Sequence, residues 1–246
     1  MTEHNFRNSK LTRVMTTACT CVLLAVSVYS FIFGVGKAVF PENQTVNTGV
    51  TQRKTIIIDA GHGGEDGGTQ SESGILEKHI NLEISTALND IFSFFGYNTV
   101  MTRSEDRLSY GNECDTMRKK KVSDIHNRMR IMENNPDSLF LSIHQNHYEG
   151  KSSWGTQVFY SDNNKKSEKI AESIQKTVAF DIQKENKRMI KKSGKEIYLL
   201  HNTKNPAVMV ECGFLSNPEE AEKLNNADYQ KLMAFEIFKG TVMAGG

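Results

Sequence analysis

The sequence predicts an α/β fold: a single domain whose mostly parallel mixed sheet of about six strands has helices on both faces, preceded by an N-terminal apolar export or anchor helix. Two observations support this fold class. Short β-branched runs alternate along the chain with stretches in which apolar residues recur at every third or fourth position. A long uncharged segment near the N-terminus is separated from the first of these runs by a polar connection.

Composition narrows the class of protein. The chain has 246 residues, with 30 Lys and Arg against 29 Asp and Glu, and 38% of its residues are hydrophobic. This length suits one domain of catalytic size, and this hydrophobic fraction supports a packed core. The balanced charge excludes a dedicated nucleic-acid-binding protein, which would show a basic excess. Four cysteines in such a length do not make a disulfide scaffold.

The N-terminal region carries an export pattern. No residue from 14 to 36 is charged, and three basic residues precede this run. Such a segment is typical of a signal peptide or membrane anchor, so residues 1–40 are expected to take the rest of the chain across the cytoplasmic membrane. Since no small-x-small cleavage site follows, a retained anchor in contact with the membrane is favoured over a secreted form. Residues 41–53 predict a linker, and the folded domain is expected over 54–246.

The first half of this domain begins with a strand. Residues 55–59 form a β-branched run that stops at glycine-rich sequence, which predicts a strand buried on both faces. Apolar residues at three- and four-residue spacing then predict a helix over 76–95. A second strand is expected at 97–102, followed by a polar loop over 103–121 and a helix over 122–134.

The second half continues the alternation of strands and helices. Four further strands are expected at 139–143, 156–160, 197–200 and 207–210. Helices are expected at 164–185, 218–224 and 228–243.

Three chemically capable side chains stand at predicted strand ends. His62 follows the first strand, His144 ends the strand at 139–143, and Glu211 ends the strand at 207–210. Because parallel strands present their carboxyl ends at one edge of a sheet, these residues are expected to converge there. Two imidazoles and one carboxylate are a familiar ligand set for catalytic zinc, which lowers the pKa of a water that a nearby carboxylate can deprotonate.

Spacing alone leaves the third ligand open among four acids. The candidates are Glu65, Asp66, Glu77 and Glu211. A single histidine after a strand is more often a packing or capping residue than a ligand, and the coincidence of two at strand ends weakens that interpretation. A carboxylate at the end of a buried strand must be paired, metal-bound or shifted in pKa, which singles out Glu211.

Four segments in order resemble the zinc-dependent N-acetylmuramoyl-L-alanine amidases of the amidase-3 type. They are DAGHGGEDGG at 59–68, EK with NL at 77–82, SIHQN at 142–146 and VECGFLSN at 210–217. The resemblance implies that His62, Glu77 and His144 hold one Zn²⁺ and that Glu211 is the catalytic acid and base. The implied reaction is hydrolysis of the amide that joins N-acetylmuramic acid to L-alanine of the peptidoglycan stem peptide.

Within this family the chain looks most like the sporulation-specific amidases that prepare muramic-δ-lactam in spore cortex. The grounds are the short N-terminal segment before a bare catalytic domain, WGTQVFY at 154–160 and GFLSNPEE at 213–220. This implies a place in the developing spore envelope. The alternatives are a vegetative cell-separation or autolytic amidase, a catalytically weak peptidoglycan-binding regulatory domain, and a zinc peptidase with another amide substrate.

Three further features bear on regulation and substrate. Gln145 and His147 are larger and more polar than the residues common in the family beside the third ligand, which is expected to affect substrate fit or metal affinity. The polar loop predicted at 103–121 offers no apolar face for an inhibitory plug, so control by expression or by an envelope or lipoprotein partner is expected. Basic residues clustered over 184–195 predict a solvated face or an attraction to stem-peptide carboxylates.

Overall fold

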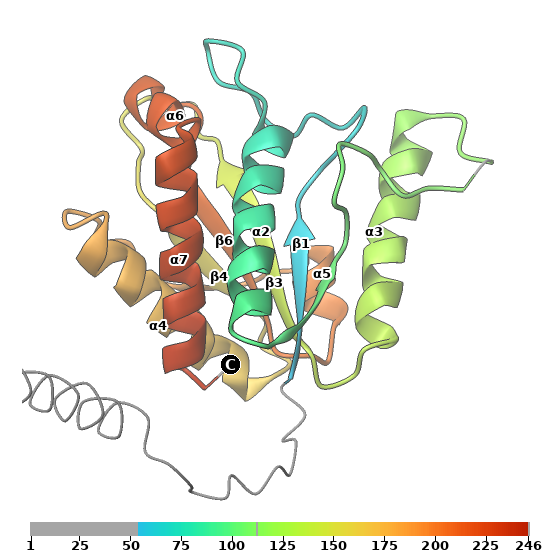
Figure 1. The fold of residues 1–246 in the computed structure, drawn as a ribbon. Helices are drawn as coiled ribbons and strands as arrows, with labels where there is room; N and C mark the ends of the chain where they lie inside the picture. Colours follow the sequence, from blue (N-terminus) through green and yellow to red (C-terminus); the bar gives the residue numbers. More distant parts are fainter. Residues whose placement is uncertain (1–53, 112, 246) are drawn as a thin grey trace, which may run out of the picture. The chain divides into compact units, whose positions relative to one another are not determined.

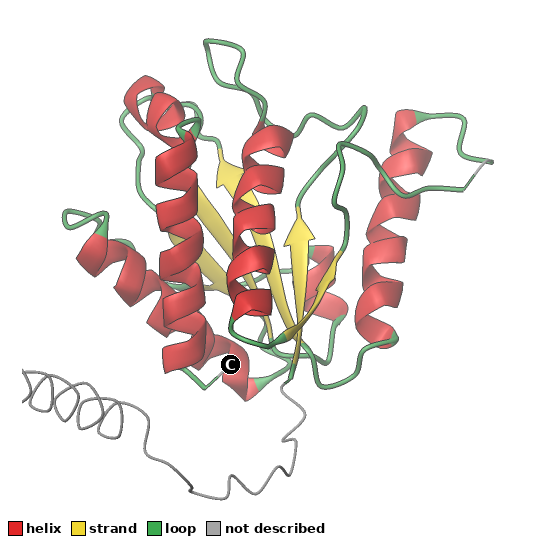
Figure 2. Cartoon of the chain, viewed as in Figure 1, coloured by secondary structure: helices red, strands yellow, loops and turns green. Residues whose placement is uncertain are grey.

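The computed structural model describes residues 54–111 and 113–245, which form one α/β unit around a six-stranded sheet (Figures 1 and 2). The strand order is β2-β1-β3-β6-β4-β5. The strands are β1 (Thr55–Ala60), β2 (Asn98–Met101), β3 (Leu139–Asn146), β4 (Gln157–Tyr160), β5 (Lys191–Lys192) and β6 (Ala207–Phe214). Residues 1–40 and the linker 41–53 lie outside the described residues, so the export segment stays a prediction.

The predicted mostly parallel mixed sheet is confirmed. Strands β2, β1, β3 and β6 pair in parallel, whereas β4 pairs with β6 in antiparallel fashion and carries β5 on its other side. The parallel strands end together at one edge, towards which the arrowheads of β1 and β3 point in Figure 1. This edge is where the sequence places the candidate ligands.

Helices cover both faces of the sheet, as alternating side chains on β1 require. Ile56 and Ile58 pack in the larger core beneath α2 (Glu77–Phe94), α4 (Lys165–Asp181) and α7 (Ala227–Met243). Ile57 points the other way, into a smaller core that α3 (Met117–Glu133) and α5 (Tyr198–Asn202) cover. Figure 1 shows α2 and α7 side by side on the first face. The short helix α6 (Pro218–Leu224) follows β6.

The predicted strand at 197–200 is wrong, because this segment is the short helix α5. Its buried side chains, Leu199 and Leu200, pack in the smaller core beside Phe140 and Met209. A four-residue apolar run has no periodicity that separates a strand from a helical turn. The sheet position beyond β4 belongs instead to β5, two exposed lysines that the hydrophobic pattern did not reveal.

Several other boundaries differ from the prediction, among them the end of the helix expected over 164–185, which is α4 and ends at Asp181. The polar loop predicted at 103–121 ends earlier, since α3 begins at Met117 and Thr116 caps it by accepting a hydrogen bond from the Lys119 amide. Four successive basic residues hid this first turn. Strands β3 and β6 also run beyond 143 and 210, so His144 and Glu211 lie within strands rather than after them.

In the part of the chain that the structure describes, no helix combines the length and the apolar character needed to cross a membrane.

Candidate active site

His62, Glu77 and His144 come together at the carboxyl edge of the sheet. His62 lies in the turn after β1, Glu77 opens α2, and His144 lies near the end of β3. Their donor atoms all lie within 4.8 Å of one another, and the two imidazole ring centroids are 5.0 Å apart. The structure therefore joins three residues that are widely separated in the sequence, and it selects Glu77 from the four acids that spacing left open.

Asp66 contacts Nδ1 of His62 and leaves Nε2 of the ring available to bind a metal ion. Its Nδ1 lies 2.8 Å from Oδ2 of Asp66, and its Nε2 lies 3.3 Å from Oε2 of Glu77. A carboxylate on the outer nitrogen fixes the tautomer and ring orientation of a metal-binding histidine. Asp66 is thus a positioning residue for His62 rather than the third ligand.

Glu77 is buried and receives several hydrogen bonds. The Thr69 amide donates to its Oε2 at 2.8 Å, and the Gln145 amide donates to its Oε1 at 3.0 Å. Burial raises the pKa of this carboxyl, but the bonds and charges of His144 and His62 outweigh burial and hold the pKa far below its usual range. Glu77 is consequently an anion at any working pH, as a metal ligand should be.

Two glycines make room for the ligands. A Cβ atom on Gly61 would collide with the His144 ring, and a Cβ atom on Gly68 would collide with the Glu77 carboxylate. His144 itself presents Nδ1 at 2.9 Å from Oε1 of Glu77. Gly68 also has φ +68°, a conformation that suits glycine.

The acids around His62 favour its charged form. Burial lowers the pKa of His62, yet the carboxylates of Asp66 and Glu77 raise it to about 9. A metal ion bound here would therefore displace a proton from this ring.

Glu211 lies beside this cluster, and one of its carboxylate oxygens lacks a hydrogen-bond partner in the described part of the chain. It pairs in register with His144 across β3 and β6. Its Oε2 is buried and has no hydrogen-bond partner among residues 54–111 and 113–245. Burial and the nearby Glu77 charge raise the pKa of Glu211 to about 7, against the opposing effect of His144 and His62. An unpartnered carboxylate of this kind can carry a proton near neutral pH.

These residues fit a zinc ion. Two imidazoles and one carboxylate leave a fourth tetrahedral position for water or substrate, which is typical of catalytic rather than structural zinc. Ligand atoms about 2.1 Å from one tetrahedral ion lie about 3.4 Å apart, comparable to the separations of Glu77 from His62 and from His144. The orphaned Oε2 of Glu211 points to a further species at this site.

A pocket of about 370 Å³ adjoins the cluster. Helices α3 and α5 form its wall on one side, and the strand ends form the other. The lining residues are Asp59, Gly61, His62, Asp66, Lys121, Asp124, Ile125, Arg128, His144, Glu196, Ile197, Tyr198, Leu199, Met209 and Glu211. None of the described residues between β2 and α3 lines this pocket, whereas Lys121, which falls within 103–121 and belongs to α3, does.

Two arginines that sequence reasoning missed hold the turn that carries His62. Arg103 donates to the carbonyls of Ala60 and Gly61, and Arg128 donates to the carbonyls of Ala60 and His62. Arg128 also forms a buried ion pair with Asp59. The sequence of α3 is polar on all sides, so it does not show which face of the helix is buried. Nothing in the sequence therefore distinguishes Arg128 from the exposed basic residues of the same helix.

The side chains of the remaining predicted candidates are not part of the metal cluster. Glu65 is exposed and pairs with Lys120 at 2.6 Å. Gln145 turns its side chain into the protein, where its Nε2 donates to Asn81, whereas His147 is exposed. The basic residues of 184–195 are mainly solvated, except that Arg188 lies over the Phe214 ring.

Comparison with known proteins agrees with this geometry. Residues 56–242 match the family model for N-acetylmuramoyl-L-alanine amidase, Amidase_3. The chain is 32% identical over 187 residues to the germination-specific N-acetylmuramoyl-L-alanine amidase of Bacillus subtilis, which covers 76% of this chain and 78% of that protein.

Two solved structures are similar over most of the described domain. The CwlD amidase of Clostridioides difficile, solved in complex with the GerS lipoprotein, has 36% identity and a TM-score of 0.76, covering 78% of this chain and 98% of that one. The amidase AmiC2 of Nostoc punctiforme has 27% identity and a TM-score of 0.66, covering 77% and 96%. The chain belongs to the N-acetylmuramoyl-L-alanine amidase family, whose members act on peptidoglycan.

Proposed function

We propose that this protein is a zinc-dependent N-acetylmuramoyl-L-alanine amidase that acts in spore cortex maturation, where peptide removal leads to muramic-δ-lactam. The observation that carries the catalytic part is the His62, Glu77 and His144 cluster facing the unpartnered carboxylate of Glu211. The family, which the comparisons show, supplies the substrate class.

In the proposed reaction the carbonyl and the water are activated by the zinc ion, and side chains and backbone amides position the ligands. When bound by His62, Glu77 and His144, zinc supplies a Lewis acid for the scissile carbonyl and lowers the pKa of a water. Asp66 holds the His62 ring so that Nε2 remains available. Amides of the Gln145 and Thr69 backbone hold the Glu77 carboxylate in place.

Glu211 moves the proton in this mechanism. Its raised pKa of about 7 allows it to accept a proton from the attacking water and to donate that proton to the departing amine of L-alanine. No other side chain of the described pocket combines an unpartnered carboxylate oxygen with this position beside the ligands. The products are a free stem peptide and a glycan strand without it.

Similarity supports the sporulation role. The germination-specific amidase of Bacillus subtilis and the CwlD amidase both resemble this chain over more than three quarters of its length. The CwlD structure contains a lipoprotein, so we extend the proposal to activation by an envelope lipoprotein. We also propose that the segment at 14–36 exports the domain and holds it at the outer side of the membrane.

Peptidoglycan digestion tests the reaction. The full chain, with and without zinc, is incubated with purified peptidoglycan, and released material is identified by mass spectrometry. We expect free stem peptides beginning with L-alanine, dependent on zinc and lost in Glu211→Gln. Glu219→Gln, the same change at an exposed position on α6, is the matched control and should retain activity. Zinc-loaded wild type that binds peptidoglycan without cleaving it would refute the enzyme and favour a binding role.

Cortex analysis tests the sporulation role separately. The chain is expressed in an endospore former that lacks its own germination-specific amidase, and spore peptidoglycan is analysed for muramic-δ-lactam. Restored lactam, absent with Glu211→Gln, is the expected result. An active amidase that restores no lactam would favour the vegetative cell-separation alternative.

A further inference from the structure

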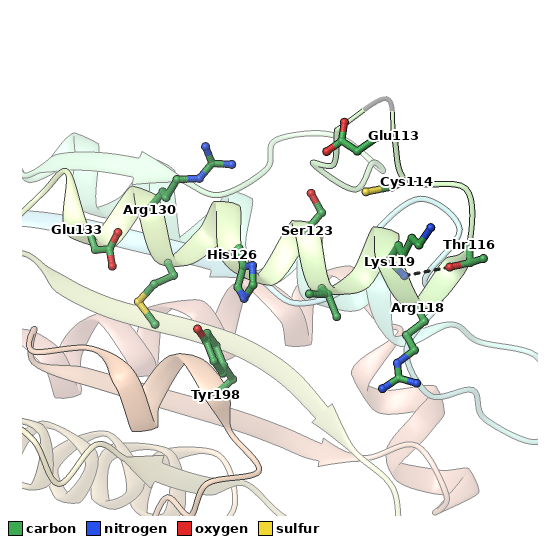
Figure 3. Close-up of a pocket in the computed structure, with 12 residues that line it drawn as sticks. Glu113, Cys114, Thr116, Arg118, Lys119, Ser123, His126, Arg130, Glu133 and Tyr198 are labelled. Carbon is green, nitrogen blue, oxygen red and sulfur yellow. Dashed lines mark hydrogen bonds between the residues drawn. The ribbon is translucent and has the colours of Figure 1, made fainter.

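A second and larger hollow runs along the outer side of α3 (Figure 3). Its volume is about 1170 Å³, roughly three times that of the pocket beside the metal cluster. The lining residues are Glu113, Cys114, Thr116, Arg118, Lys119, Val122, Ser123, His126, Met129, Arg130, Glu133 and Tyr198. We call this hollow the α3 groove.

Tyr198 lines both the α3 groove and the active-site pocket, so the two hollows adjoin at this side chain. Helix α3 serves both spaces too, because it turns Asp124 and Arg128 to the active site and Val122 and His126 to the groove. The His126 and Tyr198 rings lie 5.7 Å apart at the junction. A ligand that extends from the active-site pocket past Tyr198 would therefore reach the α3 groove.

The lining combines apolar surface with three cations, Arg118, Lys119 and Arg130, and two carboxylates, Glu113 and Glu133. Figure 3 shows Arg118 and His126 pointing to the side of α3 on which Tyr198 lies. Arg118 has no carboxylate partner within the described part of the chain, and Lys119 has only an exposed pair with Asp115. Val122 is 47% exposed and gives the groove an apolar side chain that is open to solvent. Carboxylates and small apolar groups are the chemistry that such a surface fits.

The dimensions match a short peptide. From Arg118 to Met129 the helix rises about 16 Å, at about 1.5 Å per residue. An extended peptide covers that length in about five residues, which is the length class of a peptidoglycan stem. The pocket beside the ligands, at about 370 Å³, falls near the lower limit of about 300 Å³ for small-molecule sites. A pocket of this volume has room for the reacting amide and little more of a muropeptide.

We propose that the α3 groove is the peptide subsite of this amidase. The stem peptide leaves the scissile amide, passes Tyr198 and extends along α3. Its carboxylates lie near Arg118 and Lys119, and its alanine methyl groups lie on Val122. A saccharide would gain little from two cations, whereas a stem peptide carries several carboxylates. This inference rests on the proposed amidase function and adds to it the residues that select for peptide length.

Two substrates that differ only in peptide length test the subsite. The full chain, loaded with zinc, is assayed on N-acetylmuramoyl pentapeptide and on N-acetylmuramoyl-L-alanine. The variant is the Arg118→Glu, Lys119→Glu double substitution, and Arg118→Glu alone is a milder second variant. The matched control is Lys165→Glu, Lys169→Glu on α4, which makes the same charge change at exposed positions.

We expect wild type to prefer the pentapeptide and the double variant to lose that preference. The ratio of kcat/KM on the long substrate to that on the short one should fall about tenfold, corresponding to about 1.4 kcal/mol, mainly through KM. The α4 control should keep the wild-type ratio. An unchanged ratio in the double variant would overturn the proposal. So would an unchanged ratio accompanied by lost stimulation from a lipoprotein, because the groove would then be a protein-docking surface.

Calorimetric titration with the free pentapeptide separates this proposal from the proposed function. If wild type cleaves neither substrate, the amidase proposal fails, and peptide binding still decides the role of the groove. Binding that weakens about tenfold in the double variant but not in the α4 control supports the subsite. Peptide binding that is absent, or equal in all three proteins, refutes it.

Discussion

Replacing Glu211 by Gln is expected to stabilise the metal-free protein while it removes activity. Burial raises the pKa of this carboxyl from 4.5 to about 7, and its Oε2 has no hydrogen-bond partner in the described chain. At about 1.4 kcal/mol per pH unit, that shift corresponds to about 3 kcal/mol against the charged form. Glutamine has the same shape without the charge, so the variant avoids this cost. Its buried amide lacks a hydrogen-bond partner too, which reduces the expected stabilisation by about 1 kcal/mol.

The pH dependence gives the sign of this effect. Below pH 4.5 the carboxyl is protonated in both the folded and the unfolded chain, so the charge contributes nothing. As pH rises from 4.5 to 7, the unfolded chain releases the proton first, and the folded wild type loses stability relative to Glu211→Gln. The advantage of the variant should therefore grow by about 2–3 kcal/mol between pH 5 and pH 8.

Urea unfolding of the metal-free proteins at these two pH values measures the effect. Glu219→Gln, an exposed control, should show no such pH-dependent gain. Zinc should shrink the difference, because a cation beside Glu211 stabilises its carboxylate. Activity of Glu211→Gln should fall by about 10²- to 10⁴-fold. A variant that is equally stable with wild type at pH 8, or less stable, would refute the view that Glu211 is a strained, unpartnered carboxylate.

Three other outcomes are expected. Zinc affinity should rise about tenfold per pH unit from pH 7 towards 9, because the ion displaces the proton that Asp66 and Glu77 hold on His62; calorimetry in two buffers would detect that proton, and a flat profile would contradict it. Arg128→Met should lower the unfolding free energy by about 3–5 kcal/mol in urea titrations, since it leaves buried carboxylates uncompensated, and a loss below 1 kcal/mol would argue against this. Gly61→Ala should reduce zinc stoichiometry with little change in circular dichroism, because its Cβ displaces the His144 ring; full metal loading would show that the ring can move.

The fold class was predictable because most of its strands and helices have a recognisable pattern in their own sequence. Strand β1 is a β-branched run that stops at glycines, and α2 carries a clear apolar stripe. Segment 197–200 was mispredicted because its four apolar residues fit either structure. The start of α3 was missed because its first turn is basic, and only the tertiary contacts of later turns show which of its faces is buried.

The site was predictable to a lesser depth. His62, His144 and Glu211 follow from the rule that strand ends share an edge, and the resemblance supplied Glu77. The Asp66 contact with His62 depends on the conformation of the glycine-rich loop between them, which no periodic pattern specifies. The contact of Arg128 with the His62 carbonyl depends on how α3 docks beside β1. The same docking creates the α3 groove, which no sequence pattern indicated.

The roles of the two glutamates follow from their surroundings without reference to relatives. Glu77 accepts backbone and side-chain hydrogen bonds and lies between two imidazoles, so its pKa is held far below the usual range and it stays an anion. Glu211 lies beside it with one oxygen unpartnered, so burial raises its pKa to about 7. A pair of carboxylates whose pKa values are pushed apart separates the permanent ligand from the proton carrier. Exchanging the hydrogen-bond donors around the two carboxylates would therefore exchange their roles.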